Sequence, residues 1–121
     1  MSECYCDYDP ATIYKASRPT ARKPHVCEEC GRQIQPGERY ESVFGVWENK
    51  GNTYHTCRHC LALRDYVQAH VPCFCWAHGS TIEDAMETAR SFAHEAPGFL
   101  FGAYRRQVQI HRAKRALGGK L

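Results

Sequence analysis

The pattern of apolar and polar positions predicts a β-hairpin followed by three helices. Residues 39–47 are rich in Tyr, Val, Phe and Trp, as strands are, and a turn signal at 49–52 separates them from a second strand at 53–56. Apolar residues then recur at intervals of three and four along 57–70, 80–95 and 101–117. This spacing is typical of amphipathic helices, so the sequence predicts an α+β fold.

Turn-forming residues set the limits of these elements. The run 35–38 contains Pro36-Gly37, which fits a type II turn. Pro72 ends the first predicted helix, and Ser80 with Glu83 is a capping-box candidate at the start of the second. Ala-Pro-Gly at 96–98 is expected to end that helix before the last one begins.

The first 24 residues are expected to be an arm with little regular structure. Asp9-Pro10 and Arg18-Pro19 disfavour a helix, since the residue before each proline prefers an extended backbone. The sequence therefore predicts one compact domain with three parts: the arm at 1–24, a module at 25–71, and a loop with two helices at 72–121.

Eight cysteines occur in four close pairs, and two of the pairs have the spacing of a structural zinc site. Twenty-six residues separate the two C-x-x-C pairs. Two such pairs supply the four thiolates that tetrahedral zinc requires. The predicted ligands of this first site are Cys27, Cys30, Cys57 and Cys60.

The two remaining pairs have only one residue between their cysteines. Residues two apart in an extended segment point to the same side, so each pair can give two thiolates to one ion. A second zinc site is therefore predicted at Cys4, Cys6, Cys73 and Cys75, with His78 able to replace one cysteine. The alternatives are buried reduced cysteines and redox-active thiols.

Metal binding is favoured over disulfide bonds by the absence of targeting signals. The chain starts with polar and acidic residues, with no basic segment followed by an apolar one, so no signal peptide is evident. No apolar run approaches the ~20 residues that a membrane span needs. We therefore expect a cytoplasmic protein with reduced thiols, four disulfide bonds in a secreted protein being the alternative.

The order of these features resembles two kinds of zinc module. The chain resembles the treble-clef zinc finger in the order of its parts. A C-x-x-C knuckle comes first, a hairpin follows, and a helix then carries the second C-x-x-C pair in its first turn. The stretch from Cys27 through Pro36-Gly37 to His55 and Cys60 is also similar to LIM modules, although its His-to-Cys spacing is one residue shorter and no second finger follows. The resemblance implies a metal-stabilised fold.

The whole chain also resembles small zinc-binding proteins of tailed phages and prophages. The similarity rests on the runs 21–32, 37–40 and 73–79, the last of which reads Cys-Phe-Cys-Trp-Ala-His-Gly. In a phage setting, the resemblance implies a protein that binds a host or phage protein and alters its activity.

Charge is distributed unevenly along the chain. The formal net charge is +3, but residues 99–121 hold six Lys and Arg residues and no acid, so the rest carries +3 − 6 = −3. Such a basic helix suits a partner that bears phosphates or carboxylates. The candidate contact residues are Arg105, Arg106, Arg112, Lys114 and Arg115.

The sequence does not indicate an enzyme. The zinc-deaminase pattern, H-E-x-x-H and a phosphate-binding glycine loop are all absent. Hydrolysis would require an open zinc position, for example beside His78. His55 and His25 are spare candidates for a ligand or a supporting group near the first site. The predicted function is a non-enzymatic interaction or regulatory role with a protein partner, with nucleic-acid binding as the alternative.

Overall fold

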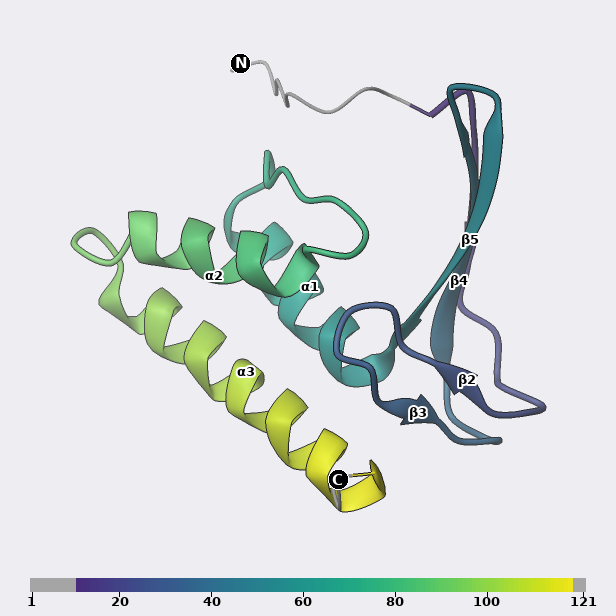
Figure 1. The fold of residues 1–121 in the computed structure, drawn as a ribbon. Helices are drawn as coiled ribbons and strands as arrows, with labels where there is room; N and C mark the ends of the chain where they lie inside the picture. Colours follow the sequence, from purple (N-terminus) through teal and green to yellow (C-terminus); the bar gives the residue numbers. More distant parts are fainter. Residues whose placement is uncertain (1–10, 119–121) are drawn as a thin grey trace.

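The computed structural model describes residues 11–118, in which a small antiparallel sheet is followed by three packed helices (Figure 1). The strands are β1 (Ile13–Ser17), β2 (His25–Val26), β3 (Gln33–Ile34), β4 (Tyr40–Trp47) and β5 (Lys50–Cys57), and the helices are α1 (Arg58–His70), α2 (Thr81–Ser91) and α3 (Pro97–Gly118). The predicted α+β class, with a hairpin before three helices, is confirmed. None of the described helices is long and apolar enough to span a bilayer.

The main sheet has the strand order β1-β4-β5 and is antiparallel throughout. Trp47 pairs with Lys50 at the end of the β4–β5 hairpin, so the turn consists of Glu48 and Asn49. Both have positive φ angles, 50° and 66°, as a type I′ turn requires. The turn therefore begins one residue before the predicted range 49–52 and contains two residues.

The N-terminal arm contains a strand that the sequence analysis did not predict. β1 pairs with β4 from Ile13 opposite Val46 to Ser17 opposite Ser42. All five residues of β1 are exposed, so the strand has no alternation of buried and exposed positions to reveal it. The expectation of an arm with little regular structure is wrong for this segment.

A second, two-stranded ribbon holds the first pair of zinc-site cysteines. His25 pairs with Ile34 and Val26 with Gln33, so the chain reverses direction between β2 and β3. Gly31 has a φ of +81° in this reversal, a conformation that a residue with a Cβ rarely adopts. At the predicted type II turn, Gly37 has a φ of +94° and the Glu38 N–H donates to the Gln35 carbonyl at 3.1 Å.

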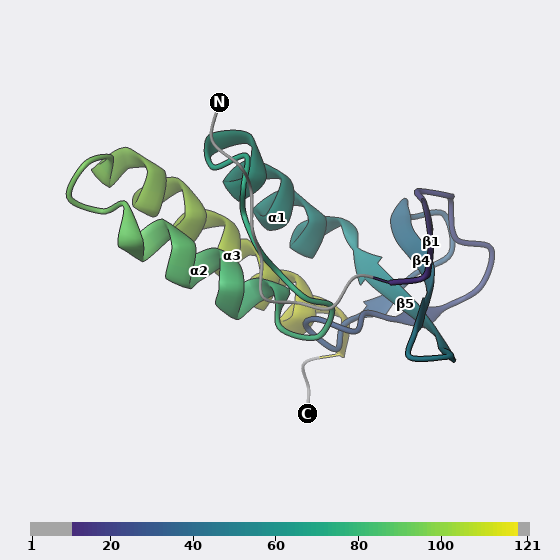
Figure 2. The same cartoon turned by 90° about the horizontal axis from the view of Figure 1, so that it is seen from above.

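The three helices pack against one another and form most of the core. Seen from above, α2 and α3 run side by side and α1 lies against both (Figure 2). Leu63 and Val67 of α1 are fully buried, as the helical pattern predicted. The core also takes residues from β3, α2 and α3, among them Ile34, Ala85, Met86, Ala89, Ala103 and Ile110.

Two helix boundaries differ from the predicted ones. α2 ends at Ser91 rather than at residue 95, and turns occupy 92–95. α3 begins at Pro97, four residues earlier than predicted. Proline is well suited to the first position of a helix, where its missing N–H has no intrahelical partner. Pro97 therefore starts α3, and Phe99 becomes a buried core residue.

Candidate metal centre

The structure brings Cys27, Cys30, Cys57 and Cys60 together, as predicted. Cys27 and Cys30 lie in the reversal between β2 and β3, Cys57 is the last residue of β5, and Cys60 lies in the first turn of α1. Their four Sγ atoms are all within 4.8 Å of one another. The cluster therefore joins the β2–β3 ribbon to the main sheet and to the start of α1.

The distances between the sulfur atoms fit a tetrahedral ion. The Sγ atoms of Cys27 and Cys60 are 3.8 Å apart, and those of Cys30 and Cys57 are also 3.8 Å apart. Zinc–sulfur bonds of about 2.3 Å at tetrahedral angles place two sulfur ligands about 3.8 Å from each other. The cluster thus needs little adjustment to hold one Zn²⁺ with four sulfur ligands.

Backbone N–H groups support the sulfur atoms as they would support thiolates. The Glu29 N–H donates to Cys27 Sγ at 3.4 Å, and the Arg32 N–H donates to Cys30 Sγ at 3.4 Å. A third N–H, that of Cys57, donates to Cys27 Sγ at 3.3 Å. Three of the four side chains are buried, with Cys30 partly exposed. Donors aimed at buried sulfur favour its charged form and fix its position.

Close contact among the thiols alters their pKa values in opposite directions. Hydrogen bonds with Cys30 and Cys60 lower the pKa of Cys27 to about 7, and contact with Cys27 also holds the pKa of Cys57 below its ordinary value. The same contacts raise the pKa of Cys30 and Cys60. A divalent cation removes this competition because it stabilises all four thiolates, and its binding releases the remaining thiol protons.

Two basic side chains lie close to the cysteine cluster and would offset the negative charge of four thiolates on a zinc ion. Arg32 is almost completely buried and forms a bidentate pair with Glu38, at 2.6 and 3.2 Å. Burial alone would lower the pKa of Arg32, but the hydrogen bonds to Glu38 and the Cys57 thiolate raise it. From α3, the Lys114 ammonium group lies over Gly31, 3.7 Å from where a Cβ would be.

The spare histidines near the cluster pack against aromatic rings. The His25 and His55 rings lie 4.4 Å apart between centroids, and both contact Tyr40. Neither histidine belongs to the group of converging ligand atoms among the described residues. Burial, followed by the charge of His25, lowers the pKa of His55. Their rings therefore pack against Tyr40 and each other, and the converging ligand atoms among the described residues are those of the four cysteines.

The predicted second site is not shown in the described part of the chain. Cys4 and Cys6 lie outside residues 11–118, and Cys73 and Cys75 are each disulfide-bonded in this structure. Within 11–118, the only group of three or more converging ligand residues is the first cluster. A disulfide sulfur is not a thiolate ligand, so the expectation of reduced thiols is not met at Cys73 and Cys75 in this structure. The second zinc ion therefore remains a prediction that requires these two cysteines to be reduced.

His78 lies in a cluster of aromatic side chains. Its ring stacks on Tyr54 at 4.6 Å and contacts Trp76, and the Tyr14 hydroxyl lies 3.0 Å from its Nε2. Burial lowers the pKa of His78. Trp47 also packs on Tyr14 and Tyr54, at 6.2 and 5.9 Å, so these side chains attach the loop before α2 to the sheet.

Glu29 links the metal cluster to α2, a role that the sequence analysis did not identify. Its carboxylate accepts hydrogen bonds from the Gly79 N–H at 2.8 Å and the Thr81 N–H at 2.9 Å. Ser80 makes no capping hydrogen bond to the backbone, so the predicted capping box is wrong. A carboxylate from a distant segment satisfies the helix start instead, and no local pattern marks such a contact.

The five basic residues predicted on the last helix have different surroundings. The Arg106 guanidinium lies 3.9 Å from the centre of the Tyr66 ring and donates to the Gly102 carbonyl at 3.1 Å. Lys114 lies over the cysteine reversal, as described above. The remaining three are exposed and have no ion pair with any residue in 11–118: Arg105, Arg112 and Arg115.

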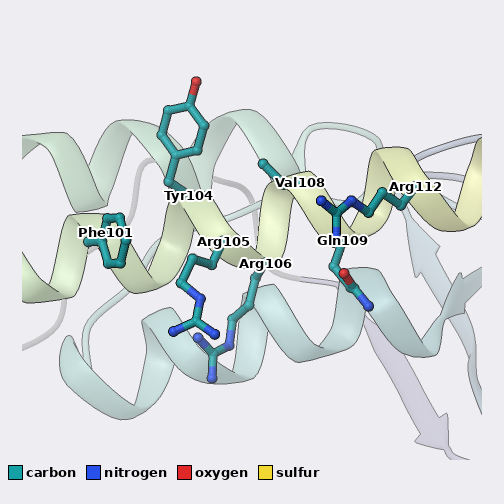
Figure 3. A pocket seen from close by; sticks show the side chains of 7 residues that line it. All are labelled: Phe101, Tyr104, Arg105, Arg106, Val108, Gln109 and Arg112. Carbon is teal, nitrogen blue, oxygen red and sulfur yellow. The ribbon is translucent and has the colours of Figure 1, made fainter.

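A groove on α3 contains several of these residues. It has a volume of about 660 Å³ and is open to solvent. Figure 3 shows that its side chains all come from α3 and are spread along the helix, with Tyr104 pointing to the opposite side from Arg105 and Arg106 in this view. They are Phe101, Tyr104, Arg105, Arg106, Val108, Gln109 and Arg112. None of them is acidic.

Comparison with protein-family models, curated proteins and solved structures gives no match to this chain. The cluster and the groove are therefore interpreted from their own chemistry.

Proposed function

We propose that this chain is a non-enzymatic interaction module that is clamped by zinc and binds an anionic macromolecule through the outer face of α3. One contrast carries the proposal. The only converging group of metal ligands in 11–118 is sulfur that is mostly buried, whereas Arg105, Arg112 and Arg115 of α3 are exposed. The metal then stabilises the fold, and binding takes place elsewhere on the surface.

The sulfur cluster supports a structural role for the metal. Four sulfur ligands complete the coordination of zinc and leave no position for the water that a catalytic zinc activates. A knuckle between β2 and β3, a hairpin of β4 and β5, and a helix that starts at the second cysteine pair have the order of a treble clef. We interpret residues 25–71 as a module of this type.

The groove on α3 supports an anionic partner. Arg105 and Arg112 are exposed and lie seven positions apart, which corresponds to about 10 Å along the helix. The guanidinium group binds carboxylates and phosphates in the same planar geometry. An acidic surface of a host or phage protein and a nucleic acid both meet this requirement. The exposed rings of Phe101 and Tyr104, which lie beside the arginines, favour a nucleic acid.

Salt-dependent binding tests this proposal. The probes are a polyglutamate peptide and oligonucleotides, and the variant is Arg105→Ala/Arg112→Ala. We expect at least one probe to bind with an affinity that falls steeply as salt is added, and we expect the variant to bind more weakly with a shallower dependence on salt.

A matched control removes the same charge elsewhere. Arg22 and Arg90 are exposed and lie outside α3. Arg22→Ala/Arg90→Ala should therefore retain most of the affinity. The proposal is wrong if no anionic probe binds, or if the two double variants lose affinity equally.

A further inference from the structure

Two large aromatic side chains on α3 are mostly exposed in the described structure. Phe101 is 66% exposed and Tyr104 is 58% exposed. Neither ring contacts another ring within residues 11–118, although most of the other aromatic residues there do. Exposed rings that do not contribute to the core are typical of a binding surface.

These rings lie next to free cationic groups on the same helix. Tyr104 and Arg105 are neighbours in the chain, and Phe101 is one helical turn before Arg105 (Figure 3). Gln109 and Arg112 continue the same row, with Gln109 also exposed. The row from 101 to 112 extends about 16 Å along the helix axis, so it fits a linear polymer better than a compact ligand.

Arg106 has a different role in this groove. Its guanidinium is held against the Tyr66 ring and the Gly102 carbonyl, so it joins α3 to α1. It adds positive potential to the groove, but its donors are partly used. The exposed side chains of the groove are two rings, two guanidinium groups and the Gln109 amide.

Resting on the function proposed above, we propose that the α3 groove binds single-stranded nucleic acid. Phe101 and Tyr104 stack on bases, and Arg105 and Arg112 bind the phosphates. Stacking on aromatic side chains combined with a basic track is the general mode of single-strand binding, and it depends little on sequence. In a duplex, by contrast, the faces of the bases are covered by their neighbours, so the two rings would have nothing to stack on.

A direct test compares a single strand with a duplex. The probes are a labelled oligothymidylate of about 12 nucleotides and a duplex of about the same length, titrated with the zinc-loaded full chain at the same salt concentration. We expect the single strand to bind at least about tenfold more tightly than the duplex. The Arg105→Ala/Arg112→Ala variant should lower the slope of log affinity against log salt by about 1.4, since each phosphate contact on a single strand contributes about 0.7.

Variants of the rings test stacking separately from charge. Phe101→Leu/Tyr104→Leu keeps apolar bulk and all charges, and both positions are exposed, so the fold should be retained. We expect about a tenfold or greater loss of single-strand affinity with an unchanged salt slope. Ile13→Leu/Phe44→Leu changes two other exposed apolar side chains, on the sheet, and should have no effect.

The remaining outcomes distinguish the proposal of single-strand binding from the broader proposal of an anionic partner. If the duplex binds as tightly as the single strand and the leucine variant has no effect, the inference is wrong but the anionic partner stands. If polyglutamate binds in a manner that depends on Arg105 and neither nucleic acid binds, the partner is an acidic protein. If no anion binds at all, both proposals fail.

Discussion

At the scale of single residues, buried charges hold the sheet to the helices. Arg64 of α1 and Glu41 of β4 are nearly fully buried and form a bidentate pair at 2.7 and 2.8 Å. The Arg64 guanidinium also lies 4.4 Å from the centre of the Trp76 ring. A buried charge that loses its partner is left without compensation, so each member of the pair depends on the other.

Replacement of Arg64 tests this dependence. Arg64→Met removes both hydrogen bonds to the buried Glu41 carboxylate and leaves it only the more distant Arg18 guanidinium, at 3.9 Å, and we expect it to lower the free energy of unfolding by about 3–5 kcal/mol. Asp65→Asn is the control, because it breaks the pair between Asp65 and Arg18 at 3.0 Å, where both side chains are 46% exposed, and leaves Glu41 unchanged; such pairs contribute about 0–1 kcal/mol. Urea unfolding of the zinc-saturated proteins measures both. Equal destabilisation by the two changes would contradict the account.

At the scale of secondary-structure elements, the start of α2 depends on the cysteine reversal. The Glu29 carboxylate lies between Cys27 and Cys30 in the chain and accepts two backbone hydrogen bonds at the α2 N-terminus. A change in the metal cluster should therefore reach α2 as well as α1, because Glu29 moves with the cluster.

Replacement of Glu29 tests this link. Glu29→Ala should lower the free energy of unfolding by about 1 kcal/mol, the usual effect of removing a helix cap. It should also speed hydrogen exchange at the Gly79 and Thr81 amides. Glu28→Ala changes the adjacent exposed carboxylate and should do neither. Unchanged exchange at both amides in the Glu29 variant would show that the link does not stabilise α2.

Local signals in the sequence were sufficient for the cysteine cluster and for most of the elements. Two C-x-x-C pairs and helical periodicity are properties of short segments, so Cys27, Cys30, Cys57 and Cys60 could be identified, together with the three helices. β1 was missed because its residues are all exposed. The sequence predicts a helix end at Pro97, whereas Pro97 begins α3, because proline breaks a helix that precedes it but also suits the first position of a new one.

Contacts between distant segments could not be predicted in the same way. Glu29 and Thr81 are 52 residues apart, and Arg64 and Glu41 are 23 apart. No local sequence pattern around Arg64 or Glu41 indicates that these side chains are buried, because charged side chains are usually exposed. The same limit applies to the basic residues of α3. Arg106 packs against Tyr66 and Lys114 lies over Gly31, and both of these partners lie far from α3 in the sequence.

At the scale of the whole molecule, one metal cluster joins elements that have few other contacts. The β2–β3 ribbon is short, and its cysteines lie against the end of β5 and the start of α1. Structural zinc contributes on the order of 10 kcal/mol of apparent folding free energy in small modules, which is comparable to the stability of an entire domain. The fold should therefore depend on the ion.

Thermal unfolding of the chain before and after removal of its metal tests this central claim most directly, with zinc content determined in each sample. We expect the purified protein to contain zinc and to unfold cooperatively. Treatment with a strong chelator should abolish the cooperative transition, and added zinc should restore it. A metal-free sample that unfolds with the same midpoint and the same cooperativity as the zinc-loaded protein would contradict the account.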